Sequence, residues 1–296
     1  MSVPRTVAII GKGRLGSVVL STLAEAGFKT TVISRSPQND EALPPNTDFK
    51  VVDYNSLDSL VAALSGQDVV VSTVNLLAVP QQKLIIDAAI KAGVERFIPS
   101  DFGSISTDLS AAHLLHNIQL VEIQNNLKSN EDLIEWTVFS IGAFTEFLVN
   151  FDIAFDWQNK SAEIWGDGGH RISTTSLLGT AKAIAAALKD PSVSKNRVLH
   201  VHELAVTQSQ LLTLAQKFSP GTTWKIKTID NPLEEMERLG KVAQQNPEPG
   251  NIYKFVRATL LSGRFQAFYE QVDNELLGLG LLTEDDLEAK FAAAFG

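Results

Sequence analysis

A six-residue turn, Gly11-Lys12-Gly13-Arg14-Leu15-Gly16, constrains the fold of this chain more than any other stretch. It follows the apolar run of residues 6–10 and opens an apolar-periodic stretch that continues to Ala26. This order predicts a strand, a glycine turn and a helix whose first-turn N–H groups and positive dipole end are free to hold a diphosphate. The turn therefore has the outline of a dinucleotide site.

Each glycine of the turn has its own steric role. Gly11 permits the tight turn, Gly13 lets a diphosphate approach the backbone, and Gly16 lets the helix pack closely on the strand. Spaced glycines also arise by chance, so a purely structural glycine turn is the alternative interpretation. The position of the motif between a predicted strand and a predicted helix favours dinucleotide binding.

The end of the second predicted strand, residues 29–35, favours the phosphorylated coenzyme. NAD sites place a carboxylate about 20 residues beyond the glycines, where it binds the ribose hydroxyls. This chain has Arg35 there, and a guanidinium suits the 2′-phosphate of NADP, with about 1.5–3 kcal/mol from a charge-assisted hydrogen bond. Lys12 and Arg14 add positive charge nearby. The alternative is that all three cations are solvated surface residues.

Strands and helices alternate through the first half of the chain. We predict strands at residues 49–53, 68–74, 95–100 and 136–141, and helices at residues 56–64, 79–92 and 110–128. This alternation predicts an α/β fold, a Rossmann-type doubly wound parallel sheet that binds its ligand at the carboxyl edge. The ends of two strands on that edge supply candidates for contact with the nicotinamide half of the coenzyme, namely Ser72, Thr73, Val74, Asn75, Ser100, Asp101 and Phe102.

The pattern changes near residue 145. We therefore divide the chain into residues 1–145, which carry the regular alternation of strands and helices, and residues 146–296. The predicted strands of the second part are residues 163–165, 198–201 and 224–229, and its predicted helices are residues 177–189, 207–218, 233–245, 252–261 and 284–295. An aromatic-rich stretch near the boundary supplies candidates for an apolar or aromatic substrate pocket: Phe139, Ile141, Gly142, Phe144, Phe147 and Phe151. The alternative for each is interdomain core.

Composition excludes several functional classes. The net charge of −9 argues against direct nucleic-acid binding, and the absence of cysteine excludes thiolate metal sites. The five histidines lack the H-E-x-x-H pattern, so we predict no metal site. His200 and His202 alternate on one strand face and are expected to be structural, with metal binding by the pair as the alternative. No stretch reaches the ~20 apolar residues needed to cross a bilayer, and the start of the chain has no signal-peptide layout. We therefore expect no membrane partner and a cytoplasmic location.

With these motifs, the chain resembles the NmrA-like, isoflavone-reductase-like group of atypical short-chain dehydrogenases, most closely its fungal members. The likeness rests on the glycine turn, on Arg35, on Gly166-Asp167-Gly168, and on residues 95–103, which are similar to the family's R-F-[IL]-P-S-E-F-G with Asp101 in place of Glu. Similar patterning at residues 207–212 and 273–278 extends it over nearly the whole chain. The resemblance implies a NADP(H)-binding Rossmann domain at residues 1–145 and a smaller, mainly substrate-binding α+β domain at residues 146–296, with some segments returning to the first sheet. It also implies reduction of small, often aromatic metabolites.

The chain departs from this family at the catalytic lysine. Family reductases have a lysine on the helix after P-S-E-F-G, and matching the helix end at residues 123–128 places Leu120 at that position. A leucine donates no proton, and loss of a general acid costs about 10²–10⁴ in rate. His116, and His113 one turn before it, are candidate replacement acids because residues three and four apart share a helix face. The alternative is two histidines on a partly exposed helix.

Three functions follow from these features. The first is a NADPH-dependent reductase of a small apolar or aromatic carbonyl, enone or imine compound of secondary metabolism. The second is a redox sensor that binds NADP(H) and acts through a partner protein, which the missing lysine favours. The third is a non-redox isomerase or cyclase on the same scaffold. A small-molecule substrate is the expected partner, and a homodimer is left open.

Overall fold

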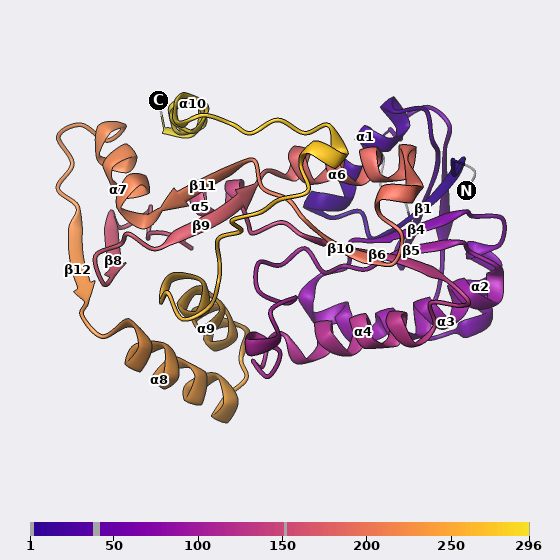
Figure 1. Ribbon diagram of the computed structural model, residues 1–296, viewed down its shortest axis with the longest axis horizontal. Helices are drawn as coiled ribbons and strands as arrows, with labels where there is room; N and C mark the ends of the chain where they lie inside the picture. Colours follow the sequence, from indigo (N-terminus) through magenta and orange to yellow (C-terminus); the bar gives the residue numbers. More distant parts are fainter. Residues whose placement is uncertain (1–2, 38–41, 151–152, 296) are drawn as a thin grey trace.

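The computed structural model describes residues 3–37, 42–150 and 153–295, and within them a parallel sheet of seven strands forms the centre of one lobe, on the right in Figure 1. The strand order is β10-β6-β5-β4-β1-β2-β3. Chain order reverses between β4 and β1, so the carboxyl ends of these two strands flank the switch point where ligands bind in such sheets. This arrangement confirms the predicted Rossmann-type fold. The bounds are β1 (Thr6–Ile10), β2 (Lys29–Ser34), β3 (Thr47–Val51), β4 (Val69–Ser72), β5 (Arg96–Ile98), β6 (Glu135–Ser140) and β10 (Arg197–His200).

Helices cover both faces of this sheet (Figure 1). On one face α1 (Arg14–Glu25) packs against α6 (Leu177–Lys189), and on the other lie α2 (Leu57–Leu64), α3 (Gln82–Ala92) and α4 (Ile118–Ser129). The buried residues of α1 recur every three or four positions, which places them on one stripe of the helix facing the sheet. The β-branched strands between the two helical layers are buried on both faces, as the apolar sequence of residues 69–71 predicts.

Two elements from the second half of the chain complete the first sheet. Strand β10 pairs in parallel with β6 at the edge of the sheet, and α6 covers α1. Ser176 caps α6 by accepting a hydrogen bond from the N–H of Gly179 at 2.9 Å. The two halves of the sequence are therefore interleaved in space, with β10 and α6 returning to the Rossmann sheet.

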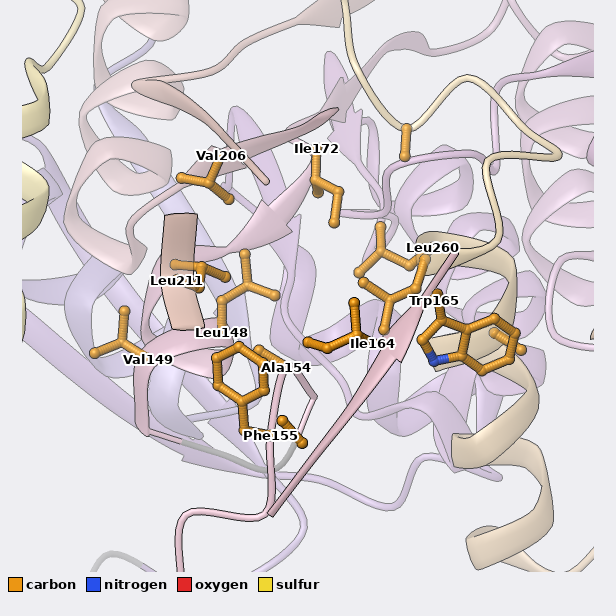
Figure 2. Close-up of a cluster of buried hydrophobic side chains, with 14 of the residues drawn as sticks. Leu148, Val149, Ala154, Phe155, Ile164, Trp165, Ile172, Val206, Leu211 and Leu260 are labelled. Atoms are coloured by element: carbon orange, nitrogen blue, oxygen red, sulfur yellow. The ribbon is translucent and has the colours of Figure 1, made fainter. Parts of the chain in front are cut away.

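The remaining elements form a second lobe with its own core. Strands β11 (Leu204–Thr207) and β7 (Ala143–Phe144) flank β9 (Arg171–Thr175), and β8 (Ser161–Trp165) pairs in parallel with β12 (Lys225–Ile229). Its helices are α5 (Thr145–Asn150), α7 (Gln208–Lys217), α8 (Pro232–Gln245), α9 (Pro249–Leu261) and α10 (Glu284–Phe295). Figure 2 shows part of this core, in which Phe155, Ile164 and Trp165 pack with aliphatic side chains from β9, β11 and α9.

A crossing segment, residues 262–283, ties the two lobes together after α9 (Figure 1). Its Asp273 forms an ion pair with Arg197 at 2.7 Å and accepts a hydrogen bond from the N–H of His200 at 2.9 Å. Leu277, in the short 3₁₀ helix η4 (Glu275–Leu277), is buried in the core between α1 and α6. The chain then returns to the second lobe, where α10 begins.

The structure corrects the predicted helix at residues 110–128. Helix α4 begins only at Ile118, and the preceding residues form a short 3₁₀ helix, η2 (Leu109–Ala111), followed by turns. Asp108 accepts a hydrogen bond from the N–H of Ser110, and the buried Asn117 side chain donates to the carbonyl oxygen of Ala111 at 3.0 Å. These side-chain bonds hold the backbone in turns, which apolar periodicity alone does not reveal.

Boundaries elsewhere shift by smaller amounts. The predicted strand at residues 49–53 lies two residues earlier, as β3, and the predicted helix at residues 79–92 divides into the 3₁₀ helix η1 (Leu76–Gln81), which contains Pro80, and α3. Strands β9 and β11 were not predicted. Among the described residues, no helix has both the length and the apolar character that a membrane span needs.

Candidate functional site

The glycine turn adopts the geometry of a diphosphate-binding turn. Gly11 has a φ of +95°, in the left-handed region that favours glycine. Gly13 is the N-cap of α1 and makes no side-chain cap bond, and the first turn of the helix has no acidic residue. A Cβ built on Gly13 meets no described atom within 4 Å, so open space lies above the N–H groups at the helix start. These features fit an anionic ligand at the positive end of the helix dipole.

Gly16 is required for close packing of the turn. A Cβ at this position would lie 2.1 Å from the carbonyl oxygen of Gly11 and 2.6 Å from Oγ1 of Thr73. Oγ1 of Thr73 itself donates to the Gly11 carbonyl oxygen at 2.7 Å, which fastens the turn to the end of β4. Gly11 thus has the backbone conformation of a tight turn, and Gly16 leaves the space that close packing needs. Gly13 has open space beside it, as an approaching diphosphate would need.

A cavity of about 370 Å³ lies beside the turn, at the carboxyl ends of β1, β2 and β4. It brings together cofactor-binding residues predicted from separate parts of the sequence: Gly11, Lys12, Gly13, Arg14, Arg35, Thr73, Val74 and Asn75. Ser34, Ser36, Tyr54 and Ala78 also line it and were not predicted. Tyr54 was identifiable in principle, because it lies just beyond the carboxyl end of β3, on the same edge of the sheet.

Four of the remaining cofactor predictions support the cavity without lining it. Gly16 and Ser72 are buried, and Leu15 packs on the core between α1 and α6. Ser100 links two strand ends: its Oγ donates to the carbonyl oxygen of Val74 at 2.8 Å, and its N–H donates to Oε1 of the buried Gln82 at 2.6 Å. These residues shape the edge of the sheet.

Asp101 and Phe102 lie one step further from the cavity. The carboxylate of Asp101 is 2 % exposed and accepts hydrogen bonds from Oγ of Ser106 at 2.6 Å and from Nε2 of Gln124 at 2.7 Å. Burial raises the pKa of this carboxyl above its ordinary value. Phe102 is half-buried and packs against the core between α1 and α6. The Asp101 network fastens the loop after β5 to helix α4.

The two histidines proposed as replacement acids do not share a helix face, because both precede α4. His113 is exposed. His116 meets the ring of Phe255 edge-on with centroids 5.5 Å apart, and burial lowers the pKa of its imidazole to about 4. Leu120 packs against the core beneath α2 to α4. Neither histidine lines the cavity beside the glycine turn, and a neutral imidazole against Phe255 is poorly placed to act as an acid.

The predicted aromatic pocket divides into two groups. Phe139 and Ile141 are 0 % exposed and belong to the core, so their side chains have no surface to offer a substrate. Gly142 has a φ of +72°, and a Cβ there would lie 1.9 Å from the carbonyl oxygen of Ser173, which gives it a packing role. Phe151 lies outside the described residues.

The second group is better placed. Phe144 and Phe147 are half-buried, with ring centroids 5.2 Å apart. The guanidinium carbon of Arg14 lies 6.0 Å from the centroid of Phe147, so this pair adjoins the glycine turn. Of the predicted aromatic pocket, Phe144 and Phe147 therefore have both partial exposure and proximity to the cavity beside the glycine turn.

Tyr269 is a buried polar residue that sequence reasoning missed. Its hydroxyl lies 2.8 Å from Oγ of Ser140, donates to the carbonyl oxygen of Ser104 at 2.7 Å and accepts from the N–H of Gly142 at 3.1 Å. Burial raises the pKa of this phenol, which stays protonated. The residues it joins are more than a hundred positions away in the sequence, so no local pattern reveals the contact.

A second cavity, of about 590 Å³, opens beside Tyr269. The imidazole of His200 borders it and meets the Tyr269 ring at 4.8 Å, and burial lowers the pKa of His200. His202 instead bonds to Oγ of Ser173 at 2.8 Å. Within the described part of the chain, no group of histidine or carboxylate side chains is arranged to hold a metal ion. The other residues that line this second cavity are Ser104, Thr107, Asp108, Leu109, Gln266, Glu270 and Gln271.

Comparison with known proteins places this geometry in a family. The NmrA-like family profile matches residues 4–245. The oxidoreductase aprR of Aspergillus flavus is 31% identical over 294 residues, which cover 96% of this chain and 97% of the relative.

Two solved structures share the fold. The crystal structure of an isoflavone reductase superimposes with a TM-score of 0.75 at 21% identity, covering 97% of this chain and 99% of that one. The NADPH-dependent quinone oxidoreductase QOR2 of Escherichia coli, complexed with NADPH, superimposes with a TM-score of 0.74 at 20% identity, covering 98% and 100%. The resemblance inferred from the glycine turn, Arg35 and residues 95–103 is confirmed, and this chain belongs to the NmrA-like family.

Proposed function

We propose that this protein is a NADPH-dependent reductase of a small apolar or aromatic carbonyl, enone or imine compound. The observation that carries the proposal is the cavity in which the glycine turn and Arg35 meet at the switch point of the sheet. A relative with 31% identity is named an oxidoreductase, and a structural neighbour is described in complex with NADPH. The cavity gives this chain residues suited to the same kind of coenzyme.

The residues present fit a phosphorylated dinucleotide at both ends of its adenosine diphosphate part. Uncapped N–H groups at the start of α1 and the open space above Gly13 suit the diphosphate. Arg35, at the end of β2, suits the 2′-phosphate through charge-assisted hydrogen bonds. Lys12 and Arg14 line the same cavity and add positive charge. Thr73, Val74 and Asn75 line the part of the cavity at the end of β4.

The chain's contribution to catalysis would be orientation. When bound, the coenzyme supplies a hydride, and holding donor and acceptor in contact provides much of the rate enhancement of such enzymes. Phe144 and Phe147 form an apolar wall near the turn that would hold a flat substrate and exclude water. With Leu120 packed against the core and His116 against Phe255, we propose that the proton comes from water or from another polar group at this edge.

A regulatory NADP(H)-binding protein is the second candidate. By the resemblance to the family's reductases, Leu120 takes the position of their lysine, and its side chain packs against the core. Loss of the general acid slows chemistry without weakening coenzyme binding. A protein of this kind would bind the coenzyme and present a surface that depends on its oxidation state to a partner protein.

One experiment separates the two candidates. NADPH absorbance is followed with a panel of aromatic ketones, enones and imines, while NADPH and NADP⁺ binding are titrated by calorimetry. Reductase activity predicts substrate-dependent NADPH consumption. Tight binding of either coenzyme without consumption would instead favour the regulatory protein. Absence of binding to both coenzymes would contradict both candidates.

A further inference from the structure

One of the residues that line the cavity beside the glycine turn is Tyr54, which has no assigned role. Tyr54 is only 6 % exposed, yet it borders the cavity with Arg35. The guanidinium carbon of Arg35 lies 5.6 Å from the centroid of the Tyr54 ring. This separation is within the ~6 Å over which an arginine is attracted to an aromatic face.

The Tyr54 ring is held in place from behind. Its hydroxyl donates to the carbonyl oxygen of Ile33 at 3.1 Å, and its ring belongs to the core formed by β1, β2 and α2. Burial raises the pKa of the Tyr54 phenol to about 12, so the hydroxyl remains a donor at physiological pH. The Tyr54 ring is therefore held in a fixed position by a hydrogen bond to Ile33 of β2, two residues before Arg35.

Arg35, in contrast, lies at the surface, where its long side chain has many rotamers to lose. Fixing such a side chain on a ligand costs conformational entropy, and a contact that already restricts it reduces the loss. Among the described carboxylates, none lies within ion-pair distance of Arg35. The ring face of Tyr54 is the aromatic surface against which the guanidinium rests.

We propose that Tyr54 is a specificity-determining positioning residue that holds the Arg35 guanidinium at the mouth of the cavity, ready for the 2′-phosphate of the coenzyme. This inference rests on the proposed NADP(H) binding. It adds that the preference for the phosphorylated coenzyme belongs to the Arg35–Tyr54 pair, with the arginine making the contact and the tyrosine fixing its position.

The test isolates the adenosine end of the site. Calorimetry measures the affinities of adenosine 2′,5′-bisphosphate and of 5′-AMP for the wild type and for Tyr54→Leu, Tyr54→Phe, Arg35→Ala and the Arg35→Ala/Tyr54→Leu double variant. The ratio of the two affinities reports recognition of the 2′-phosphate, and the affinity for 5′-AMP reports an intact site.

We expect Tyr54→Leu to lower this ratio about two- to fivefold, the range of an exposed cation–π contact, with little change in 5′-AMP affinity. Tyr54→Phe keeps the ring face and should stay within about twofold of wild type. In the Arg35→Ala background, Tyr54→Leu should change the ratio no further. If Tyr54→Leu fails to fold, Tyr54→Met replaces it, since methionine keeps a long apolar side chain without a ring.

The outcomes distinguish this inference from the proposed function. An equal loss of affinity for both ligands, or the same loss of ratio with and without Arg35, would show a merely structural tyrosine and overturn the inference while NADP(H) binding stands. A wild-type protein that does not prefer the bisphosphate would overturn the inference together with the proposed coenzyme specificity.

Discussion

The hydroxyl of Thr73 donates to the carbonyl oxygen of Gly11 across 2.7 Å and joins the glycine turn to the end of β4. Both atoms lie where a side chain on Gly16 would have to go: a Cβ there would be 2.1 Å from the Gly11 oxygen and 2.6 Å from the Thr73 hydroxyl oxygen. The bond and the bare glycine therefore depend on each other. The turn keeps its shape only while residue 16 has no side chain.

Gly16→Ala should disturb both the fold and the coenzyme site. Because the added methyl meets backbone, the turn has to move, and overpacking of this kind costs about 1–3 kcal/mol in the free energy of unfolding. We expect a lower thermal midpoint and at least a roughly tenfold loss of NADPH affinity, since 1.4 kcal/mol corresponds to that factor. Differential scanning fluorimetry measures the thermal midpoint, and calorimetry measures the NADPH affinity. A normal midpoint with normal affinity would show that the turn relaxes freely.

Gly13→Ala provides the contrasting case in the same turn. The residue has a φ of −86°, which alanine adopts without strain, and no described atom lies within 4 Å of the added Cβ. The thermal midpoint should change little. NADPH affinity should still fall about tenfold, because the methyl occupies the space where the diphosphate approaches. Unchanged affinity would argue that the diphosphate lies elsewhere.

Arg35→Ala should change coenzyme preference more than overall stability. Loss of a charge-assisted contact to the 2′-phosphate should reduce the ratio of NADPH to NADH affinity about 10- to 100-fold. Lys12→Ala is the matched control, because Lys12 lies in the turn beside the expected diphosphate and should weaken both coenzymes alike. An unaltered preference in Arg35→Ala would refute the assignment of NADP.

Acid should destabilise the protein through His116. Burial holds the pKa of its imidazole near 4, below the ordinary value of 6.5, so the unfolded chain binds the proton more tightly. The free energy of unfolding should fall as pH drops from about 6.5 to 4, by up to about 1.4 kcal/mol per pH unit from this group. His116→Phe keeps an aromatic partner for Phe255 and removes this contribution.

Urea denaturation of wild type and His116→Phe at several pH values measures the difference between their free energies of unfolding. Above pH 6.5, the free energy of unfolding should change with pH in the same way for both proteins. Below pH 6.5, the free energy of unfolding of the wild type should fall more steeply than that of the variant. Turnover in the variant should match wild type, because His116 lies against Phe255 and not in the coenzyme cavity. A large loss of turnover would restore His116 as a candidate acid.

Tyr269→Phe should destabilise the junction between the lobes. Removing the hydroxyl leaves the buried N–H of Gly142 and the hydroxyl of Ser140 short of a partner, at a cost of about 1–3 kcal/mol. An unchanged midpoint in denaturant would contradict the structural role.

Local patterns predicted the parts of the fold and site whose determinants lie close together in the sequence. The glycine turn, the buried strand at residues 69–71 and Arg35 all depend on a strand and its adjacent turn, and parallel strands bring these ends to one edge. The first half of the predicted helix at residues 110–128 failed for a local reason as well, since Asp108 and Asn117 hold the backbone in turns.

Other features depend on contacts that no local pattern encodes. The short strands β9 and β11 were missed because each is defined mainly by its antiparallel partner. Phe139 and Ile141 carry the same aromatic and apolar character whether they line a pocket or fill a core, and α6, which buries them, arrives some 40 residues later. Tyr269 meets Ser140 only after the crossing segment returns to the first lobe.

The return of β10 to the sheet has a consequence for how the polypeptide is made. A growing chain that has emerged only as far as residue 145 lacks strand β10, which pairs with β6, and helix α6, which covers α1. Strand β6 would then be an exposed edge strand, whose unpaired backbone N–H and C=O groups can pair with strands of neighbouring molecules. Fragments that end at residue 145 should precipitate. During translation, the Rossmann sheet is complete only after residue 200 has been synthesised.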